Sequence, residues 1–250
     1  MNALIVGASS GLGRALAEEL AACGANLFLA ASDLRDLEPL AADLRTRFGI
    51  KAAVEAVDLR SFDAALFRQA CLGALGSIDA LFYAAGVSLI EKDPSRLSGP
   101  EIEALAAVNF TAGVKIVNSF IDDLARAPRA VCVGIGSVAE ARPRGQNTVY
   151  AASKRGLEFY FSGLRQLLAG SPVKVQFYRV GYMDTQLSFG RDGPLPKADP
   201  KRLAAAICRR LDKDFGVAYL PGWWGLAAAA YRLIPWPLFK RMSPAAGKPS

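Results

Sequence analysis

The sequence contains no histidine. A Ser-His-Asp hydrolase, a Cys-His protease and a histidine-ligated zinc site all depend on an imidazole, so these three classes of site are excluded before any geometry is considered. Any proton transfer at neutral pH must therefore use another side chain.

Paired cysteines and export signals are also absent. The four cysteines, at positions 23, 71, 132 and 208, form no Cys-x-x-Cys pair, and each stands among apolar residues, as buried free thiols often do. The N-terminus shows no basic stretch, apolar h-region or cleavage site, because Asn2–Val6 leads directly into a glycine loop. We therefore expect a cytoplasmic protein in a reducing compartment.

Long runs of one charge are missing too. The formal net charge is +7, but lysine and arginine are scattered, with only short clusters such as Arg209-Arg210 and Lys240-Arg241. This distribution favours a solvated basic surface together with an anionic cofactor. We expect no nucleic-acid partner.

The chain is rich in apolar residues, which make up 52% of its 250 residues and suffice for one large core. Short apolar segments alternate with longer helix-patterned segments as far as Leu220, and this pattern predicts βαβ units. The expected strands are Asn2–Val6, Asn26–Ala31, Ala52–Ala56, Ala80–Ala84, Ala130–Val133, Lys174–Tyr178 and Val217–Leu220. The prediction is an α/β fold with a doubly wound, parallel, seven-stranded Rossmann-type sheet and helices on both faces.

Helices are expected between these strands. The predicted ranges are Leu12–Ala22, Leu34–Phe48, Phe62–Leu72, Glu101–Ala127, Val149–Leu168 and Pro200–Leu211. Asp199 and Pro200 supply an N-cap and a first helical residue for the last of them. Right-handed crossovers place alternate loops at the carboxyl edge of the sheet, where a ligand should bind.

A glycine loop follows the first strand. Gly7 permits a tight turn, Gly11 lets the backbone approach a pyrophosphate, and Gly13 allows close helix packing, while the helix N-terminus offers free N–H donors. The expected cofactor contacts in this loop are Gly7, Ser9, Ser10, Gly11, Leu12 and Gly13. Residues 1–220 are therefore predicted to form a dinucleotide-binding and catalytic domain, with 221–250 as an apolar tail of the same domain.

Two further segments fit the adenosine half of a dinucleotide. Asp58 and Leu59 follow the third strand, where the Asp58 carboxylate could meet adenine. Ala84, Ala85 and Gly86 follow the fourth strand, and their small side chains leave room for a ligand.

The end of the second strand bears on cofactor choice. Folds that prefer NAD usually place a carboxylate there against the ribose 2′-hydroxyl, but this sequence has Ala31 and Ser32. Ser32, with Arg35 and Arg14, could instead contact a 2′-phosphate. We expect a preference for NADP(H); Asp33, one residue later, leaves NAD(H) open as the alternative.

Tyr150 and Lys154 have the spacing i, i+4 at the start of a helix, which places both side chains on one face. A phenol with a pKa near 10 is a poor acid–base catalyst at neutral pH, and a neighbouring ammonium is expected to lower its pKa. Tyr150 is therefore the predicted catalytic acid or base.

Two more residues complete the candidate site. Ser137 ends the fifth strand, where its hydroxyl could hydrogen-bond the substrate oxygen. Gly134-Ile135-Gly136-Ser137 also resembles a nucleophile elbow, but the second flanking glycine is replaced by Ala139 and no histidine exists. Asn109, inside a helical segment, is a candidate for holding a water.

Together these motifs resemble the short-chain dehydrogenase/reductase family over about residues 1–220. The resemblance implies that Tyr150 transfers the proton, Ser137 orients the carbonyl, Lys154 binds the nicotinamide ribose and lowers the phenol pKa, and Asn109 holds a relay water. It also implies that the stretch 179–185 contacts the nicotinamide through Gly181 and Thr185. Val180 there replaces the family's proline. A homodimer or homotetramer is the expected assembly.

The tail beyond Leu220 is the least typical part. Tryptophans flank a short apolar segment that ends in basic residues, and the stretch is too short and broken to span a membrane. Trp223–Arg241 could be a pocket lid, a subunit contact or a peripheral membrane contact. It also looks somewhat like the tail of bacterial reductases acting on polyprenyl-phosphate sugars.

The predicted function is reduction of a hydrophobic or lipid-linked ketone, or the reverse oxidation of an alcohol. The family's enoyl reductases use a wider Tyr–Lys spacing and its sugar epimerases a different glycine pattern, so both are disfavoured. A non-catalytic nucleotide-binding sensor on the same fold remains the alternative, because a fold does not by itself fix function.

Overall fold

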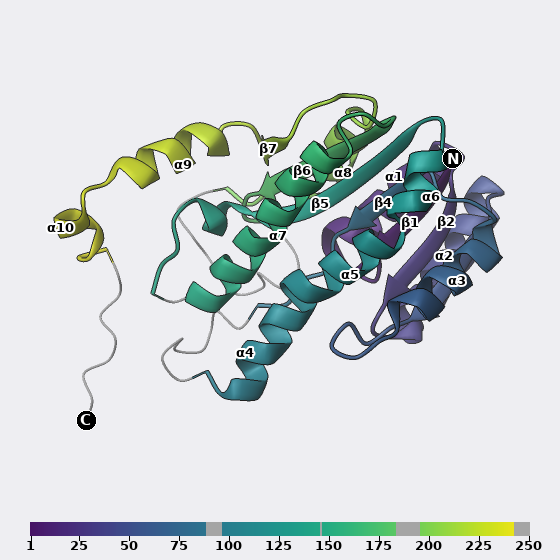
Figure 1. Cartoon of the computed structure of the whole chain (residues 1–250), viewed down its shortest axis with the longest axis horizontal. Coiled ribbons are helices and arrows are strands. Elements are labelled where there is room, and N and C mark those ends of the chain that lie inside the picture. Colours follow the sequence, from purple (N-terminus) through teal and green to yellow (C-terminus); the bar gives the residue numbers. More distant parts are fainter. Residues whose placement is uncertain (89–96, 146, 184–195, 243–250) are drawn as a thin grey trace.

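The computed structural model describes residues 1–88, 97–145, 147–183 and 196–242, and within them seven parallel strands form one sheet (Figure 1). The strand order is β3-β2-β1-β4-β5-β6-β7, which confirms the predicted doubly wound sheet. The strands are β1 (Asn2–Val6), β2 (Asn26–Ala31), β3 (Ala52–Ala56), β4 (Ala80–Tyr83), β5 (Ala130–Ser137), β6 (Val173–Val180) and β7 (Val217–Leu220). The order reverses between β1 and β4, which is the point where such sheets bind ligands.

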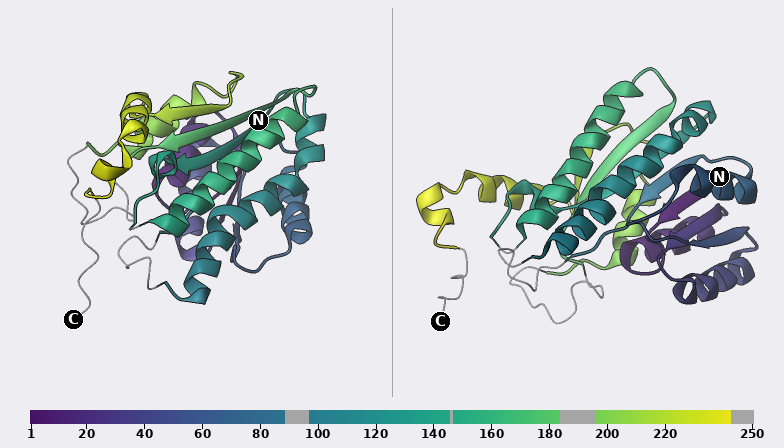
Figure 2. Two further views of the ribbon diagram at one scale, coloured as in Figure 1. Left: turned by 60° about the vertical axis from the view of Figure 1, so that its left-hand side comes forward. Right: turned by 60° about the horizontal axis from the view of Figure 1, so that its bottom comes forward.

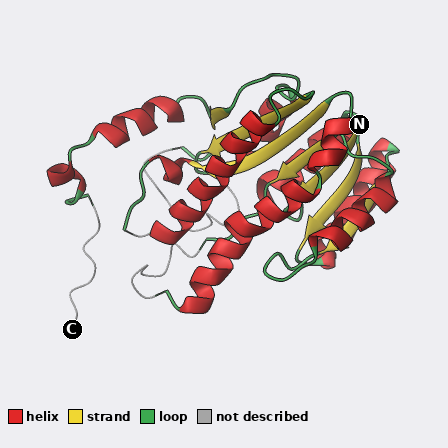
Figure 3. Cartoon of the chain, viewed as in Figure 1, coloured by secondary structure: helices red, strands yellow, loops and turns green. Residues whose placement is uncertain are grey.

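Helices flank this sheet (Figure 3). Those that pack directly on it or beside it are α1 (Gly11–Ala22), α2 (Leu34–Phe48), α3 (Ala64–Leu75), α7 (Thr148–Leu167) and α8 (Pro200–Cys208). Three begin at an aspartate whose carboxylate accepts a backbone N–H of the first turn: Asp33, Asp63 and Asp199. These caps explain why the predicted starts of α2 and α8 are correct to the residue.

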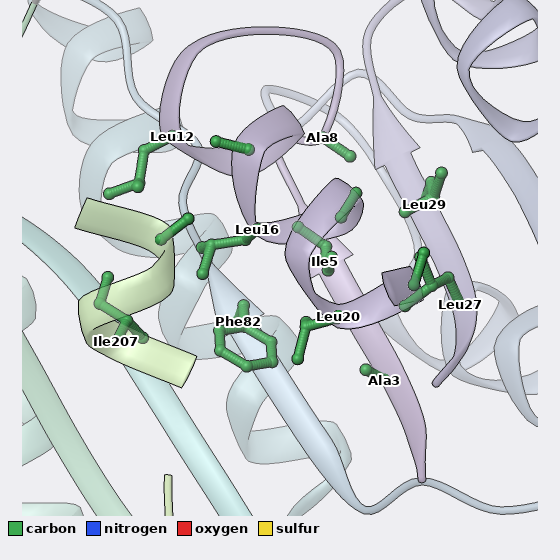
Figure 4. Close-up of a cluster of buried hydrophobic side chains, with 14 of the residues drawn as sticks. Ala3, Ile5, Ala8, Leu12, Leu16, Leu20, Leu27, Leu29, Phe82 and Ile207 are labelled. Atoms are coloured by element: carbon green, nitrogen blue, oxygen red, sulfur yellow. The ribbon is translucent and has the colours of Figure 1, made fainter. Parts of the chain in front are cut away.

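Each face of the sheet carries its own core, because successive side chains of a strand point to opposite sides. In β1, Ala3 and Ile5 join the cluster beneath α1, α2 and α8, which Figure 4 shows. Leu4 and Val6 join the other cluster, beneath α3, α5 (Ala112–Ser119) and α7. All four side chains are fully buried, which accounts for the continuously apolar sequence of this strand.

The segment predicted as one helix over Glu101–Ala127 is helical, but it is not one continuous α-helix. The chain instead forms α4 (Gly99–Ala106), a π-helical turn η2 (Ala107–Thr111), α5 (Ala112–Ser119) and α6 (Ile121–Arg126). Two contacts hold the π-helical turn against the end of β4: the Tyr83 hydroxyl donates to the Val108 carbonyl, and the Asn109 amide binds the backbone of Val87. These long-range bonds favour the extra residue in the turn, and turns of this kind often occur at functional sites.

Beyond β7 the chain forms a C-terminal arm, defined here as Trp223–Arg241, which contains α9 (Trp224–Leu233) and α10 (Trp236–Phe239). The arm projects from the sheet end of the molecule in all views (Figures 1 and 2). Trp224 and Ala228 are its buried residues, whereas Leu226 and Leu233 are 80% and 81% exposed. No helix in the described part of the chain is long and apolar enough to cross a membrane.

Candidate active site

The glycine loop between β1 and α1 packs tightly against the end of β4. Gly7 has φ +89°, and a β-carbon there would lie 2.6 Å from the backbone nitrogen of Ala85. A β-carbon at Gly13 would lie 2.0 Å from the carbonyl oxygen of Gly7. Both positions therefore require glycine, which agrees with the tight turn and the close helix packing predicted for them.

This loop fits the pyrophosphate of a dinucleotide. Gly11, with φ +54°, opens α1, and the N-cap residue Ser10 makes no side-chain cap hydrogen bond. The first turn of α1 has no acidic residue, so its free N–H groups face no competing carboxylate. Ser9 is partly exposed, whereas the Leu12 side chain is buried in the core, so Leu12 could contribute only backbone to such a site.

The polar groups at the ends of β2 and β3 are engaged in local ion pairs. Asp33 accepts the backbone N–H of Arg35 at 2.9 Å and its guanidinium Nε at 2.8 Å, and these hydrogen bonds lower the pKa of Asp33. Ser32 beside it is exposed. Arg14, the other candidate for a 2′-phosphate, lies 3.3 Å from Glu18.

Asp58 is held in the same way. Its carboxylate accepts the backbone N–H and the guanidinium of Arg60, and these hydrogen bonds lower its pKa to about 2. Leu59 packs on the edge of the core beneath α3. Both residues lie at the carboxyl edge of the sheet, next to the end of β2, as the strand order requires.

Ser137 and Tyr150 meet at the end of β5. Ser137 is the last residue of the strand, and its Oγ accepts the backbone N–H of Ala139 at 3.2 Å as the cap of a 3-10 turn, η3 (Val138–Ala141). Tyr150 lies in the first turn of α7, close enough to the Ser137 side chain for that hydroxyl to lower the pKa of the phenol. The two side chains predicted to hold the substrate oxygen are therefore adjacent.

The expected lowering of the Tyr150 pKa does not occur in the protein without ligands. Burial raises this pKa to about 12, and the neighbouring Ser137 side chain offsets only part of that effect. The phenol is consequently protonated at neutral pH.

Lys154 lies one turn after Tyr150 and is 4% exposed. Its Nζ donates to the carbonyl oxygens of Ala85 at 3.0 Å and Ile135 at 3.3 Å. Burial lowers its pKa to about 8. Gly86 makes the space for the ammonium, since a β-carbon there would lie 2.8 Å from Nζ. Lys154 thus joins α7 to the ends of β4 and β5.

Asn109 is fully buried in the π-helical turn. Its Oδ1 accepts the backbone N–H of Val87, and its Nδ2 donates to the Val87 carbonyl, both at 2.9 Å. This is the backbone-bonded arrangement expected of a helical asparagine. Because both amide atoms are bonded to Val87, the side chain of Asn109 is already engaged.

The stretch after β6 is described only in part. Val180 replaces the family's proline and pairs with both Ser137 and Leu220, so β6 runs unbroken to the site. The Gly181 N–H donates to the Leu220 carbonyl at 2.9 Å. Thr185, the predicted carboxamide contact, lies outside the described residues.

The arm reaches this edge of the sheet, which the sequence did not reveal. A β-carbon at Gly181 would lie 1.9 Å from Nε1 of Trp224, so glycine there admits the indole. Trp224 stacks on Trp223 at a centroid distance of 4.5 Å and meets the Tyr182 ring edge-on at 5.6 Å. The Trp224 N–H is buried without a hydrogen-bond partner in the described part of the chain. These aromatic rings lie beside Gly181, which follows Val180, the strand partner of Ser137.

Arg142, directly after η3, ties the arm to the catalytic loop. Its guanidinium donates to the carbonyls of Tyr231, Arg232 and Ile234 at the end of α9. It also lies 3.7 Å from the centroid of the Phe239 ring. A cation at a helix C-terminus satisfies free carbonyls and opposes the helix dipole.

The described residues contain no group of three His, Cys, Asp or Glu side chains that could hold a metal ion.

Comparison with known proteins finds relatives that span the whole chain. Residues 1–192 match the model of the short chain dehydrogenase family. An uncharacterized oxidoreductase of Mycobacterium tuberculosis is 30% identical over 247 residues, covering 96% of each chain. Among solved structures, a short-chain dehydrogenase from Sphingobium yanoikuyae in complex with NADPH has a TM-score of 0.80 at 25% identity, covering 100% of this chain and 98% of its own. The bulky-bulky ketone specific alcohol dehydrogenase from Comamonas testosteroni has a TM-score of 0.78 at 26% identity, covering 99% and 96%.

Proposed function

The chain belongs to the short-chain dehydrogenase family of oxidoreductases, and from this premise we propose that it interconverts a bulky ketone and its secondary alcohol with NADP(H). One observation supports this most strongly. Tyr150 lies beside Ser137, and Lys154 is fixed one turn away between the ends of β4 and β5. A nucleotide sensor would have no use for this arrangement.

The nicotinamide, when bound, supplies or accepts the hydride. The side chains of this protein manage the proton. Ser137 offers its hydroxyl to the substrate oxygen, and Tyr150 donates its proton to that oxygen as the carbonyl is reduced. Lys154 places a positive charge near the phenolate that remains. Because burial raises the pKa of Tyr150 to about 12, the phenol holds its proton at neutral pH, as reduction requires.

The preference for NADP(H) is supported by the end of β2. The carboxylate of Asp33 already caps α2 and pairs with Arg35, so it is occupied before any ribose arrives. The Arg35 side chain is 89% exposed and could turn toward a 2′-phosphate. The S. yanoikuyae relative is in complex with NADPH.

A bulky, hydrophobic substrate is supported by the arm. Trp223, Trp224 and Tyr182 form an aromatic wall next to Gly181. Aromatic walls of this size bury large apolar surfaces, which favours bulky ketones over small polar ones. The C. testosteroni relative is named for its specificity for bulky ketones.

More specifically, the bulky substrate is proposed to be linked to a lipid, and the arm is proposed to contact a membrane surface. The outer side of the arm exposes Leu226, Leu233 and Trp236, and the basic residues Lys240 and Arg241 follow α10. An apolar surface bordered by cations suits anionic lipid. Sedimentation with anionic vesicles tests it: binding that falls with salt and with Leu233→Ser supports membrane contact, whereas no binding leaves the arm as a pocket wall.

The proposed assembly is a homodimer or homotetramer. On α7, Phe159 and Leu167 are 65% and 71% exposed, and Ile102 on the neighbouring helix α4 is exposed as well. Large exposed apolar side chains on adjacent helices are typical of a subunit contact.

The proposed location is the cytoplasm, or its membrane surface if the arm contacts lipid. The four cysteines are free thiols in the structure, which supports this location.

The proposed reaction can be tested with a panel of ketones of increasing bulk. Oxidation of NADPH is followed in the presence of each ketone, with NADH in parallel. We expect ketone-dependent oxidation of NADPH that is faster for bulky apolar ketones than for acetone. The protein would be better described as a nucleotide sensor if it binds NADPH but neither reduces any ketone of the panel nor oxidises the corresponding alcohols with NADP+.

A further inference from the structure

A cluster of buried charged side chains lies directly behind the candidate active site. Glu140 is in η3, Lys154 and Glu158 are on α7, and Arg179 is on β6, and all four are buried. Glu158 follows Lys154 by four residues, as Lys154 follows Tyr150, so the three share one face of α7. Glu140 follows Ser137 by three residues. Each carboxyl is therefore one turn away from a catalytic side chain.

Glu158 is the ionised member of the two carboxyls. Arg179 binds it with two nitrogens, Nε to Oε2 and Nη2 to Oε1, the latter at 2.6 Å, and Arg155 Nη1 adds a third hydrogen bond at 2.6 Å. Although burial alone raises the pKa of Glu158, these hydrogen bonds hold it below its ordinary value. Arg179 also donates to the Tyr219 hydroxyl on β7, so its charge is matched within this pair.

Glu140 has a different environment. Its side chain is fully buried, and its Oε1 accepts the backbone N–H of Ser137. A β-carbon at Gly136 would lie 2.2 Å from that oxygen, so the glycine before Ser137 makes room for the carboxyl. A side chain at position 136 would therefore displace the Glu140 carboxyl, so this carboxyl can bind here only because the strand has glycine at that position.

The surroundings of the second oxygen of Glu140 indicate which of the two carboxyls, Glu140 or Glu158, carries a proton. Oε2 has no donor in the described part of the chain and lies 3.8 Å from Nε of Arg179. Its other neighbour is the carboxyl of Glu158, which raises the pKa of Glu140. Two carboxyls can share a hydrogen bond only if one carries a proton. Burial and the adjacent Glu158 raise the pKa of Glu140 well above its ordinary value, whereas the pKa of Glu158 is lowered, so Glu140 is the carboxyl that favours a proton.

We propose that Glu140 is a positioning residue that works as a neutral carboxylic acid, fixing the Ser137 backbone while donating its own proton to Glu158. Its effect on rate rests on the proposed function. With Arg179 matched to Glu158, the ammonium of Lys154 is left without a buried counter-ion in this cluster. An ionised Glu140 would neutralise that ammonium and oppose charge on the Tyr150 phenolate, whereas a neutral acid leaves the field of Lys154 for the phenolate.

Two substitutions separate the roles of Glu140. Glu140→Gln keeps an oxygen for the Ser137 N–H and supplies an amide N–H to Glu158, as the neutral acid does. Glu140→Leu has a similar size but leaves the Ser137 N–H buried without an acceptor. Glu38→Gln, at an exposed position on α2, is the matched control.

Three measurements on the full-length protein give the test. The infrared difference spectrum between wild type and Glu140→Gln at neutral pH should show the C=O stretch of a protonated carboxylic acid, and the Glu38→Gln control should show none. Hydrogen exchange in residues 133–141 should be faster in Glu140→Leu and close to wild type in Glu140→Gln. With NADPH and an accepted ketone, Glu140→Leu should lower kcat about tenfold or more, and Glu140→Gln should recover most of this loss.

Absence of the protonated-acid band in wild type, or a Glu140→Gln variant as impaired as Glu140→Leu, would show that Glu140 acts as a carboxylate and overturn the proposal. Equal exchange rates in all three proteins would overturn its role in fixing Ser137. If wild type oxidises NADPH with no ketone, the proposed function fails, and the infrared and exchange measurements still decide whether Glu140 is a neutral acid that fixes Ser137.

Discussion

Lys154 and Gly86 fit together only because position 86 has no side chain: a β-carbon there would lie 2.8 Å from the Lys154 Nζ and 3.3 Å from Oδ1 of Asn109. The Lys154 ammonium, which is proposed to support catalysis, can therefore occupy its position only because residue 86 is glycine. From the sequence alone, the same glycine, which follows the fourth strand, indicates only room for a cofactor.

Gly86→Ala should reduce activity without unfolding the protein. The atom that must move is the end of a flexible side chain, so the fold can adapt while Nζ leaves the carbonyls of Ala85 and Ile135. We expect kcat/KM to fall about tenfold or more, with a loss of unfolding free energy below about 1 kcal/mol. The control adds the same methyl group at Gly73, in α3, where nothing lies within 4 Å. Gly73→Ala should keep full activity and gain about 0.5–1 kcal/mol. Unchanged kinetics in Gly86→Ala would contradict this role for the glycine.

The buried Lys154 should make stability depend on pH in a defined window. Burial lowers its pKa from 10.5 to about 8, so between these values the unfolded chain binds more protons than the folded one. Stability from this residue consequently rises as pH increases through the window. Relative to Lys154→Met, wild type should gain about 2–3 kcal/mol between pH 7 and pH 10 in urea unfolding. A stability difference that stays constant with pH would show that Lys154 titrates normally.

Cofactor preference should depend on Arg35. Arg35→Ala is expected to weaken NADPH binding about tenfold and to leave NADH binding unchanged, because only NADPH carries the 2′-phosphate. Arg47→Ala, at the other end of α2 and paired with Asp43, is the control. Fluorescence titration of both reduced cofactors measures the effect. If wild type binds NADH as tightly as NADPH, Asp33 and not Arg35 governs this site.

The arm should lose its attachment when Arg142 is replaced. Arg142→Ala removes the donors to three carbonyls at the end of α9 and the contact with the Phe239 ring. We expect KM for bulky ketones to rise about tenfold, whereas KM for small ketones and NADPH affinity should change little. Arg165→Ala, which removes an exposed ion pair with Asp214, serves as the control. An equal loss with small and bulky ketones would instead place the effect on Ser137 through η3.

The features predicted correctly from the sequence are those with local causes. The bounds of β1, β2, β3, β7 and α2 agree to the residue, because apolar runs and N-cap aspartates are adjacent in sequence to the elements they define. Tyr150 and Lys154 fall on one helical face because their spacing fixes it. The glycine loop adopts its turn because φ values near +89° and +54° favour glycine.

The features that escaped prediction depend on partners distant in sequence. The π-helical turn at Asn109 forms because Tyr83 and Val87 bind it. The raised pKa of Tyr150 follows from tertiary burial, which spacing alone does not reveal. Glu158 could have been found, since it continues the i, i+4 series of Tyr150 and Lys154. The contact of Trp224 with Gly181 had no signal beyond the small residue at position 181.

The central claim is that Tyr150 gives its proton to the substrate oxygen, and Tyr150→Phe tests it most directly. The substitution removes the hydroxyl and leaves the glycine loop untouched, so chemistry and cofactor binding can be separated. NADPH affinity is measured by fluorescence titration, and turnover is measured with the best ketone of the panel. We predict a loss of kcat of about a thousandfold or more, with NADPH affinity within about twofold of wild type. Turnover near the wild-type rate in a folded Tyr150→Phe protein would contradict the mechanism.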